Sequence, residues 1–124
     1  WDVLRQIDIS FDCFPHNSGN TLLESLYLGV PYITLSSRPS VGRIGASILI
    51  AVNNSEWIAE TEKEYIDKAV ALASNLPDLA KIRSQLRAKL QSSPITNEID
   101  FVKKLEIAYR QMWKKWCENG LSDL

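Results

Sequence analysis

Four residues between positions 19 and 24 have the types and spacing that suit binding of a phosphate and an attached ribose. Gly19 has no Cβ, so a phosphate can approach its backbone, and the side chains of Asn20 and Thr21 can donate hydrogen bonds. Glu24 lies about one helical turn later, where a carboxylate can accept hydrogen bonds from ribose hydroxyls. The spacing fits equally well a structural alternative, in which Asn20 caps a helix and Glu24 faces solvent. The segment matches neither the Walker motif nor the dinucleotide fingerprint.

The elements around these residues form a predicted βαβ unit. A strand-like run spans residues 7–12, a loop of small residues leads into a helix-like run, and a second strand-like run spans residues 31–35. Such a loop places backbone N–H groups at a helix N-terminus, where the helix dipole adds partial positive charge. The arrangement predicts an α/β fold with a nucleotide or nucleotide-sugar ligand at the end of the first strand.

Three further side chains near this loop could meet a ligand. His16 lies in the loop itself and is expected to contact the ligand rather than to transfer a proton, because no nucleophile or partner is in view. Arg38 and Arg43 flank the turn after the second strand, and either could pair with a diphosphate. A surface ion pair is the favoured interpretation of Arg38. Arg43 remains a secondary candidate whose main expected role is to brace the loop, and no catalytic residue is assigned.

The composition argues against several function classes. The 124 residues carry a net charge of −1 and a pI of about 5.8, which disfavours a nucleic-acid partner. One histidine and two distant cysteines, Cys13 and Cys117, form no metal-spaced cluster, and no apolar run reaches membrane-spanning length. Both cysteines are expected to be free, packed thiols in a reduced compartment, so a cytoplasmic location is predicted.

Helices are predicted for most of the chain beyond residue 40. Ser40 is expected to cap a helix over residues 41–52, in which Gly42 and Gly45 indicate close packing or a ligand. Residues 57–59 form a short edge strand, and Thr61 with Glu64 forms a capping box for the next helix. The predicted buried faces of the next two helices are Ile66, Ala69, Val70 and Ala73, followed by Leu79, Ile82, Leu86 and Leu90.

The last predicted helix runs from about residue 98 to residue 118 and ends at Asn119-Gly120. Its apolar face comprises Ile99, Val102, Leu105, Tyr109, Met112 and Trp116. This face is expected to pack onto the α/β part, so Leu105→Ala should cost about 2–5 kcal/mol. The cations Arg110, Lys114 and Lys115, interleaved with Trp113, are assigned to the solvated side of this helix rather than to a nucleic-acid patch.

The chain starts at Trp1, almost directly before a strand, and is therefore expected to be a piece of a longer protein. Residues 1–124 are treated as one fragment. Residues 1–60 form its α/β portion with the ligand loop, and residues 61–120 form a helical closing portion.

A series of short motifs runs in order along nearly the whole chain. They are residues 8–12 (Asp-Ile-Ser-Phe-Asp), 14–21 (Phe-Pro-His-Asn-Ser-Gly-Asn-Thr), 24–31 (Glu-Ser-Leu-Tyr-Leu-Gly-Val-Pro), 38–47 (Arg-Pro-Ser-Val-Gly-Arg-Ile-Gly-Ala-Ser), 56–59 (Glu-Trp-Ile-Ala) and a tail over residues 92–116. In this order they resemble the C-terminal end of glycosyltransferase family 41, the O-linked N-acetylglucosamine transferase and SPINDLY-type enzymes. Animal members have His-Thr-Thr in place of Gly19-Asn20-Thr21 and Asp in place of Glu24, which indicates a bacterial-type branch.

The resemblance implies both a fold and a function. Family members have a GT-B architecture, and this chain would be the second half of its Rossmann-like donor-binding domain, followed by C-terminal helices. Gly19, Asn20 and Thr21 would contact the donor diphosphate, and Glu24 would contact the ribose. The parent enzyme would be an inverting, metal-independent transferase that passes a sugar from a UDP-N-acetylglucosamine-type donor, or a GDP-sugar, to a protein Ser/Thr hydroxyl.

The resemblance also implies that part of the machinery lies upstream of this chain. Acceptor-side residues and a lysine that contacts the diphosphate would precede it, often after tetratricopeptide repeats, so the isolated chain is expected to be inactive. The expected partners are a nucleotide-sugar donor and, through upstream regions, a protein acceptor. Neither a metal cofactor, a nucleic acid nor a membrane is expected. The alternative is a non-catalytic interaction or regulatory module that keeps a degenerate GT-B half-domain.

Overall fold

A small parallel sheet lies at the centre of the computed structural model, which describes residues 2–119. Its strands are β1 (Ser10–Phe11), β2 (Tyr32–Leu35) and β3 (Ile58–Ala59), and they lie in the order β1-β2-β3. Ser10 pairs with Tyr32, and Thr34 pairs with Ile58, in parallel register. The carboxyl ends of the three strands therefore meet at one end of the sheet, and the short strand predicted at residues 57–59 is confirmed as an edge strand.

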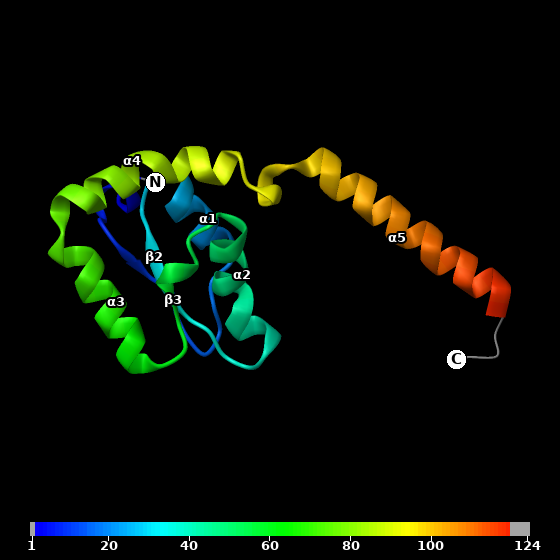
Figure 1. Ribbon diagram of the computed structural model, residues 1–124, viewed down its shortest axis with the longest axis horizontal. Coiled ribbons are helices and arrows are strands. Elements are labelled where there is room, and N and C mark those ends of the chain that lie inside the picture. The colour runs from blue at the N-terminus through cyan, green and yellow to red at the C-terminus, as the bar shows by residue number, and fades with distance from the viewer. Residues whose placement is uncertain (1, 120–124) are drawn as a thin grey trace.

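Helices surround the sheet and extend from it. Within residues 2–119 they are α1 (Asn20–Tyr27), α2 (Ile44–Ala51), α3 (Glu62–Ser74), α4 (Leu76–Gln91) and α5 (Glu98–Asn119). Helices α2 and α3 lie on opposite sides of the strands (Figure 1). Helix α4 crosses the end at which the strands begin, where its Arg83 donates a hydrogen bond to the carbonyl of Ile7 (2.7 Å). The opposite end of the sheet, where the strands finish, is not covered by α4.

The hydrophobic core forms between β2 and the helices around it. The side chains of Tyr32 and Ile33 are fully buried, and they join one cluster with Leu22 and Leu26 of α1 and Leu49 of α2. Helix α4 adds Leu79, Leu86 and Leu90, with Ile82 partly buried beside them. The predicted buried face of α4 is therefore confirmed, and this packing holds α1 and the loop before it against the sheet.

The first strand is shorter than predicted. A strand was expected over residues 7–12, but β1 covers only Ser10–Phe11. Because β2 begins at Tyr32, which pairs with Ser10, the residues before Ser10 have no strand beside them in the described chain. The backbone at Ile7 is bound by the Arg83 side chain instead of by a strand.

The helix expected over residues 41–52 is also shorter and differently capped. Residues Ser40–Arg43 form a 3₁₀ turn, and α2 starts at Ile44 with Arg43, not Ser40, as its N-cap. The turn is tight because Gly42 lies against the residues before it. A Cβ on Gly42 would lie 1.8 Å from the Ser37 hydroxyl oxygen and 3.2 Å from the Pro15 carbonyl oxygen. Close packing at Gly42 was therefore predicted correctly, although the helix boundary was not.

Helix α3 begins as predicted, but only Ala69 of its predicted apolar face is buried. The amide of Glu64 donates to the Thr61 hydroxyl (3.1 Å), which confirms the cap. Ile66 and Val70, however, are 60% and 58% exposed. The buried face includes Tyr65, because its hydroxyl donates to the backbone carbonyl of Asp12 (2.7 Å) and thereby fixes the rotation of the helix.

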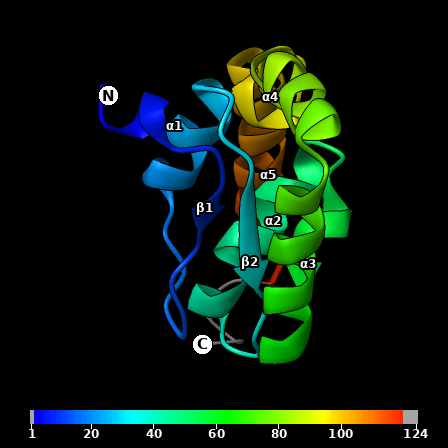
Figure 2. The ribbon, with the colours of Figure 1, turned by 90° about the vertical axis from the view of Figure 1, so that its left-hand side faces the viewer.

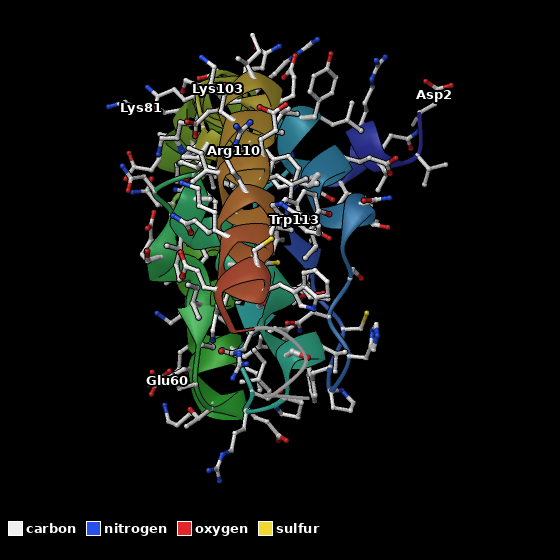
Figure 3. The ribbon with its side chains drawn as sticks, turned by 90° about the vertical axis from the view of Figure 1, so that its right-hand side faces the viewer. Asp2, Glu60, Lys81, Lys103, Arg110 and Trp113 are labelled. Atoms are coloured by element: carbon white, nitrogen blue, oxygen red, sulfur yellow. The ribbon has the colours of Figure 1, made fainter. Side chains whose placement is uncertain are left out.

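Helix α5 does not pack onto the rest of the described chain, which corrects the expectation for its apolar face. It points away from the body of the molecule (Figure 1). Figure 3 shows Arg110 and Trp113 along its length. The expected face is exposed at Ile99, Val102, Leu105, Tyr109, Met112 and Trp116, with Leu105 the least exposed at 37%. The chain changes direction after α4. The Thr96 hydroxyl donates hydrogen bonds to the carbonyls of Leu90 and Gln91 in the last turn of α4, and these bonds end that helix. Gly120, the predicted helix end, lies outside the described residues.

Candidate functional site

The predicted ligand loop lies at the end of the sheet where the strands finish. The loop between β1 and α1, the turn after β2 and the start of α3 gather at this same end (Figure 2). In parallel α/β sheets, ligands bind in the crevice outside the carboxyl ends of the strands. The fold therefore places the loop where such sheets bind ligands.

A network of short hydrogen bonds shapes the loop itself. The Asp12 carboxylate accepts a hydrogen bond from the Ser18 amide (2.8 Å), which draws the two ends of the loop together. The Asn17 side chain donates to the carbonyl of Cys13 (3.1 Å), and the Asn17 amide donates to the carbonyl of Val41 (3.0 Å). These hydrogen bonds hold the two ends of the loop together and attach the loop to the turn that precedes α2.

Helix α1 begins directly after this loop, with Gly19 as its N-cap. The first amides of a helix have no acceptor within the helix, and Gly19 has no side chain that could accept from them. Asn20 and Thr21 are exposed in the first turn, and Glu24 is half-buried one turn later. The structure therefore brings all four predicted residues together. Asn20 is the first helical residue rather than the N-cap, so the purely structural alternative is wrong on that point.

Behind the loop lies a buried polar layer built from three elements. The Thr34 hydroxyl of β2 donates to the second oxygen of the Asp12 carboxylate (2.7 Å), and the Tyr32 hydroxyl donates to the carbonyl of Gly45 on α2 (2.8 Å). A Cβ on Gly45 would lie only 2.4 Å from Asp12 Oδ2 and 2.5 Å from Thr34 Oγ1. Only glycine fits here, as the sequence indicated for Gly45, because the helix packs directly on the polar side chains.

Two tyrosines at this polar layer have pKa values above the usual value. Burial, followed by the charge of the Asp12 carboxylate, raises the pKa of the Tyr32 phenol far above its usual value. Burial raises the pKa of Tyr65 to about 12, with smaller contributions from the charges of Asp12 and Cys13. Both phenols are therefore neutral hydrogen-bond donors at neutral pH.

The secondary candidates lie beside the site rather than within the network. The guanidinium of Arg43 donates to the carbonyl of Arg38 (2.6 Å), so it braces the turn after β2 rather than the ligand loop. Arg38 and His16 have exposed side chains on the same end of the molecule. Either could meet a ligand that approaches from solvent, and Arg43 could do so only by giving up its backbone contact.

Sequence reasoning missed two residues that shape the site. Asp12 and Asn17 are each 1% exposed, and neither was singled out as more than part of a strand or a loop. Asn17 Oδ1 and Ser37 Oγ are buried and have no hydrogen-bond partner among residues 2–119. A buried acceptor without a partner is costly, so both atoms lower the stability of this end of the sheet. A polar residue ending a strand, as Asp12 does, was the available signal.

Two surface hollows lie apart from the residues predicted to hold a phosphate, and one of them is lined by Glu24. One of about 390 Å³ lies at the junction of α4 and α5, and another of about 280 Å³ is lined by Leu23, Glu24, Tyr27 and Leu90. Neither is lined by Gly19, Asn20 or Thr21. Among residues 2–119 there is no cluster of three or more potential metal ligands, and no helix there is both long and apolar enough to cross a bilayer.

Comparisons with known proteins agree with this geometry. A sequence model described as glycosyl transferase family 41 matches residues 4–105. The chain belongs to glycosyltransferase family 41. It is 40% identical over 118 residues to a protein of Arabidopsis thaliana named probable UDP-N-acetylglucosamine–peptide N-acetylglucosaminyltransferase SPINDLY, which covers 95% of this chain. A second Arabidopsis thaliana family 41 protein, named SEC with the same probable activity, is 33% identical over 111 residues and covers 89% of the chain.

A solved family 41 structure confirms the fold. The O-GlcNAc transferase of Thermobaculum terrenum, solved as a mutant, superimposes with a TM-score of 0.85 at 36% identity over 95% of this chain. The chain is thus the second half of a Rossmann-like GT-B donor-binding domain followed by C-terminal helices. It spans 23% of that solved chain and only 13% of the SPINDLY relative.

Both cysteines are free, as predicted, but neither is packed. Cys13 and Cys117 are exposed, and the Cys13 sulfur lies 3.2 Å from the Ser18 hydroxyl. A thiol reagent should therefore label two cysteines per chain under native conditions, without reductant and without denaturant. Mass spectrometry would count the labels. Labelling that requires denaturant would contradict the exposure, and two fewer labels under all conditions would indicate a disulfide.

Proposed function

We propose that this chain forms the donor-diphosphate part of a protein O-glycosyltransferase. The observation that carries the proposal is the start of α1, where Gly19 caps the helix and exposed Asn20 and Thr21 follow at the carboxyl end of β1. Membership in glycosyltransferase family 41 supplies the reaction class. Helix N-termini that open from a tight loop after a strand bind phosphate groups through backbone N–H groups and the helix dipole.

The residues would act on the leaving group. Backbone amides of the first turn, the Thr21 hydroxyl and the Asn20 side-chain amide would donate hydrogen bonds to the diphosphate. Negative charge builds up on that group as the sugar departs, so fixed donors there stabilise the transition state more than the ground state. The Glu24 carboxylate, one turn further along α1, would accept hydrogen bonds from the ribose hydroxyls. These donors would allow an inverting reaction without a metal ion.

The proposed donor is UDP-N-acetylglucosamine or a related UDP- or GDP-sugar. Relatives named for N-acetylglucosaminyl transfer from UDP-N-acetylglucosamine to peptide support this donor and a protein acceptor, for which we propose a Ser/Thr hydroxyl. Acceptor binding, a further diphosphate contact and any tetratricopeptide repeats would belong to sequence upstream of this chain. We extend the proposal to a cytoplasmic enzyme of a bacterial-type branch, without a nucleic-acid or membrane partner. The residues Gly19 and Asn20, which stand where animal members have His-Thr, support that branch.

The proposal predicts where activity resides. This 124-residue chain alone should transfer no sugar, because it covers only 13% of the length of its SPINDLY relative. A polypeptide that contains the chain and spans the family length should transfer sugar from UDP-N-acetylglucosamine or a GDP-sugar to protein. In that polypeptide, Thr21→Val should lower kcat/KM by about tenfold or more, since it removes a hydrogen bond to a charged group.

The assay measures radiolabelled sugar on protein. Ser84→Ala is the matched control, because it removes an exposed hydroxyl on α4, far along the chain from the loop. Equal activity of Thr21→Val and Ser84→Ala would argue against the proposed role of the loop. Transfer by the isolated chain would show that the upstream regions are not needed. A full-length polypeptide without any transfer would favour the alternative of a non-catalytic module.

A further inference from the structure

Asp12 stands out among the buried groups of this chain. The residue is 1% exposed, and its carboxylate forms no ion pair with any of residues 2–119. Burying a carboxylate without a countercharge is costly unless hydrogen bonds replace its hydration. Both carboxylate oxygens are occupied: Oδ1 by the Ser18 amide (2.8 Å) and Oδ2 by the Thr34 hydroxyl (2.7 Å).

We propose that Asp12 is the positioning residue of the donor loop. Its carboxylate binds the amide of Ser18, the residue immediately before Gly19, and so fixes the direction in which the chain enters α1. The amides of the first helical turn follow directly in the chain, so the same hydrogen bond also sets their direction. The inference rests on the proposed function, because it names the residue that sets the diphosphate donors in place.

Three elements hold Asp12 itself in position. Thr34 lies beside it on β2, where the backbone amide of Asp12 also donates to the carbonyl of Ile33 (3.0 Å). Gly45 of α2 closes the space behind the carboxylate, since any Cβ would meet Asp12 Oδ2 at 2.4 Å. The Tyr65 hydroxyl of α3 donates to the Asp12 carbonyl (2.7 Å). The sheet and both covering layers therefore converge on this one residue.

Asp12 acts through the loop and not by touching the ligand. A carboxylate next to a diphosphate would repel it, and both oxygens of Asp12 are already engaged with protein donors. Asp12 is 1% exposed, so a ligand that approaches from solvent does not contact its carboxylate. Its contribution is to hold neutral donors in a fixed arrangement before the ligand arrives, which is how preorganised sites gain affinity.

The test measures UDP binding and amide exchange in the same ¹⁵N-labelled chain. Asp12→Ala, which removes the acceptor for the Ser18 amide, should weaken UDP binding by about tenfold or more. Asp12→Asn keeps an oxygen for that amide and should stay within about threefold of wild type. Ile82→Val is the control, because it loosens the core on α4 without touching the loop, and UDP affinity should be unchanged.

Amide hydrogen exchange separates positioning from general stability. Exchange at the Ser18 amide, which donates to Asp12 in the wild-type chain, should be about tenfold faster in Asp12→Ala, relative to the core amides of the same variant, and unchanged in Ile82→Val. If Asp12→Ala does not fold, Thr34→Val and Tyr65→Phe each remove one hydrogen bond to Asp12 and should weaken UDP binding by about threefold to tenfold.

Two outcomes overturn the inference, and one overturns only the proposed function. A folded Asp12→Ala chain with wild-type UDP affinity and wild-type exchange at the Ser18 amide would show that Asp12 positions nothing. Wild-type affinity in both Thr34→Val and Tyr65→Phe would do the same where Asp12→Ala does not fold. If the wild-type chain binds neither UDP, GDP nor pyrophosphate, the proposed function fails, and the exchange measurement still decides whether Asp12 orders the loop.

Discussion

Replacing Leu86 with alanine should lower the free energy of unfolding of this chain by about 2–5 kcal/mol. Leu86 is 1% exposed and lies in the main core cluster, to which α4 contributes where it packs against α1 and α3. Alanine would remove buried methyl and methylene groups and leave a cavity that the surrounding helices could close only in part. Urea denaturation followed by circular dichroism would measure the change.

Leu105→Ala is the matched control for this substitution. It makes the same change on α5, where Leu105 is 37% exposed, so the expected loss is less than about 1 kcal/mol. This value replaces the larger one that its sequence pattern predicts. A loss at position 105 as great as that at position 86 would mean that α5 packs against the body of the molecule, contrary to the structure.

Gly45→Ala should also destabilise the chain, by about 1–3 kcal/mol. Within a helix, alanine normally stabilises relative to glycine by about 1 kcal/mol, so the sign of the effect is informative. At this position a Cβ would meet Asp12 Oδ2 at 2.4 Å and Thr34 Oγ1 at 2.5 Å, and both side chains are buried with no room to move. A thermal melt of the variant would show the lowered stability.

Gly19→Ala provides the comparison, because no atom lies within 4 Å of the Cβ it would add. Its loss of stability should be smaller, about 1 kcal/mol or less, because only the preference of the N-cap for glycine over alanine is lost. If Gly45→Ala were as stable as Gly19→Ala or more so, the tight packing of α2 on the Asp12 carboxylate would be contradicted.

Local sequence patterns predicted those elements whose partners lie in the chain itself. The apolar spacing from Leu79 to Leu90 identified the buried face of α4 correctly, since α1 and α3 lie opposite it. The similar spacing on α5 was equally regular, yet nothing among residues 2–119 covers it. Periodicity shows that a helix has an apolar face, and it cannot show what lies against that face.

Rotation of α3 was mispredicted for a different reason. Ile66 and Val70 looked more apolar than Tyr65, but the Tyr65 hydroxyl has a hydrogen-bond acceptor in Asp12, 53 positions earlier in the chain. A single long-range hydrogen bond of this kind is invisible in the local pattern. It also places an aromatic ring against Phe11 and Phe14, with ring centroids 5.8 and 5.7 Å away.

The candidate site was accessible from sequence only in part. Residue types and the strand-loop-helix order indicated Gly19, Asn20, Thr21 and Glu24, and the structure brings them together at the start of α1. The supporting layer of Asp12, Asn17 and Thr34 was not predicted as a unit. Its members come from β1, the loop and β2, and only the register of the parallel strands places Asp12 beside Thr34.

An NMR titration of the ¹⁵N-labelled chain with UDP, GDP and inorganic pyrophosphate tests the central claim most directly. The account predicts weak, saturable shifts of the amides of residues 18–21 with UDP or GDP, and a reduced response in Thr21→Val. Binding should be weak because the proposed upstream contacts are absent from this chain. Amides of residues 18–21 that ignore all three ligands at millimolar concentration, while another surface responds, would contradict the donor-site assignment.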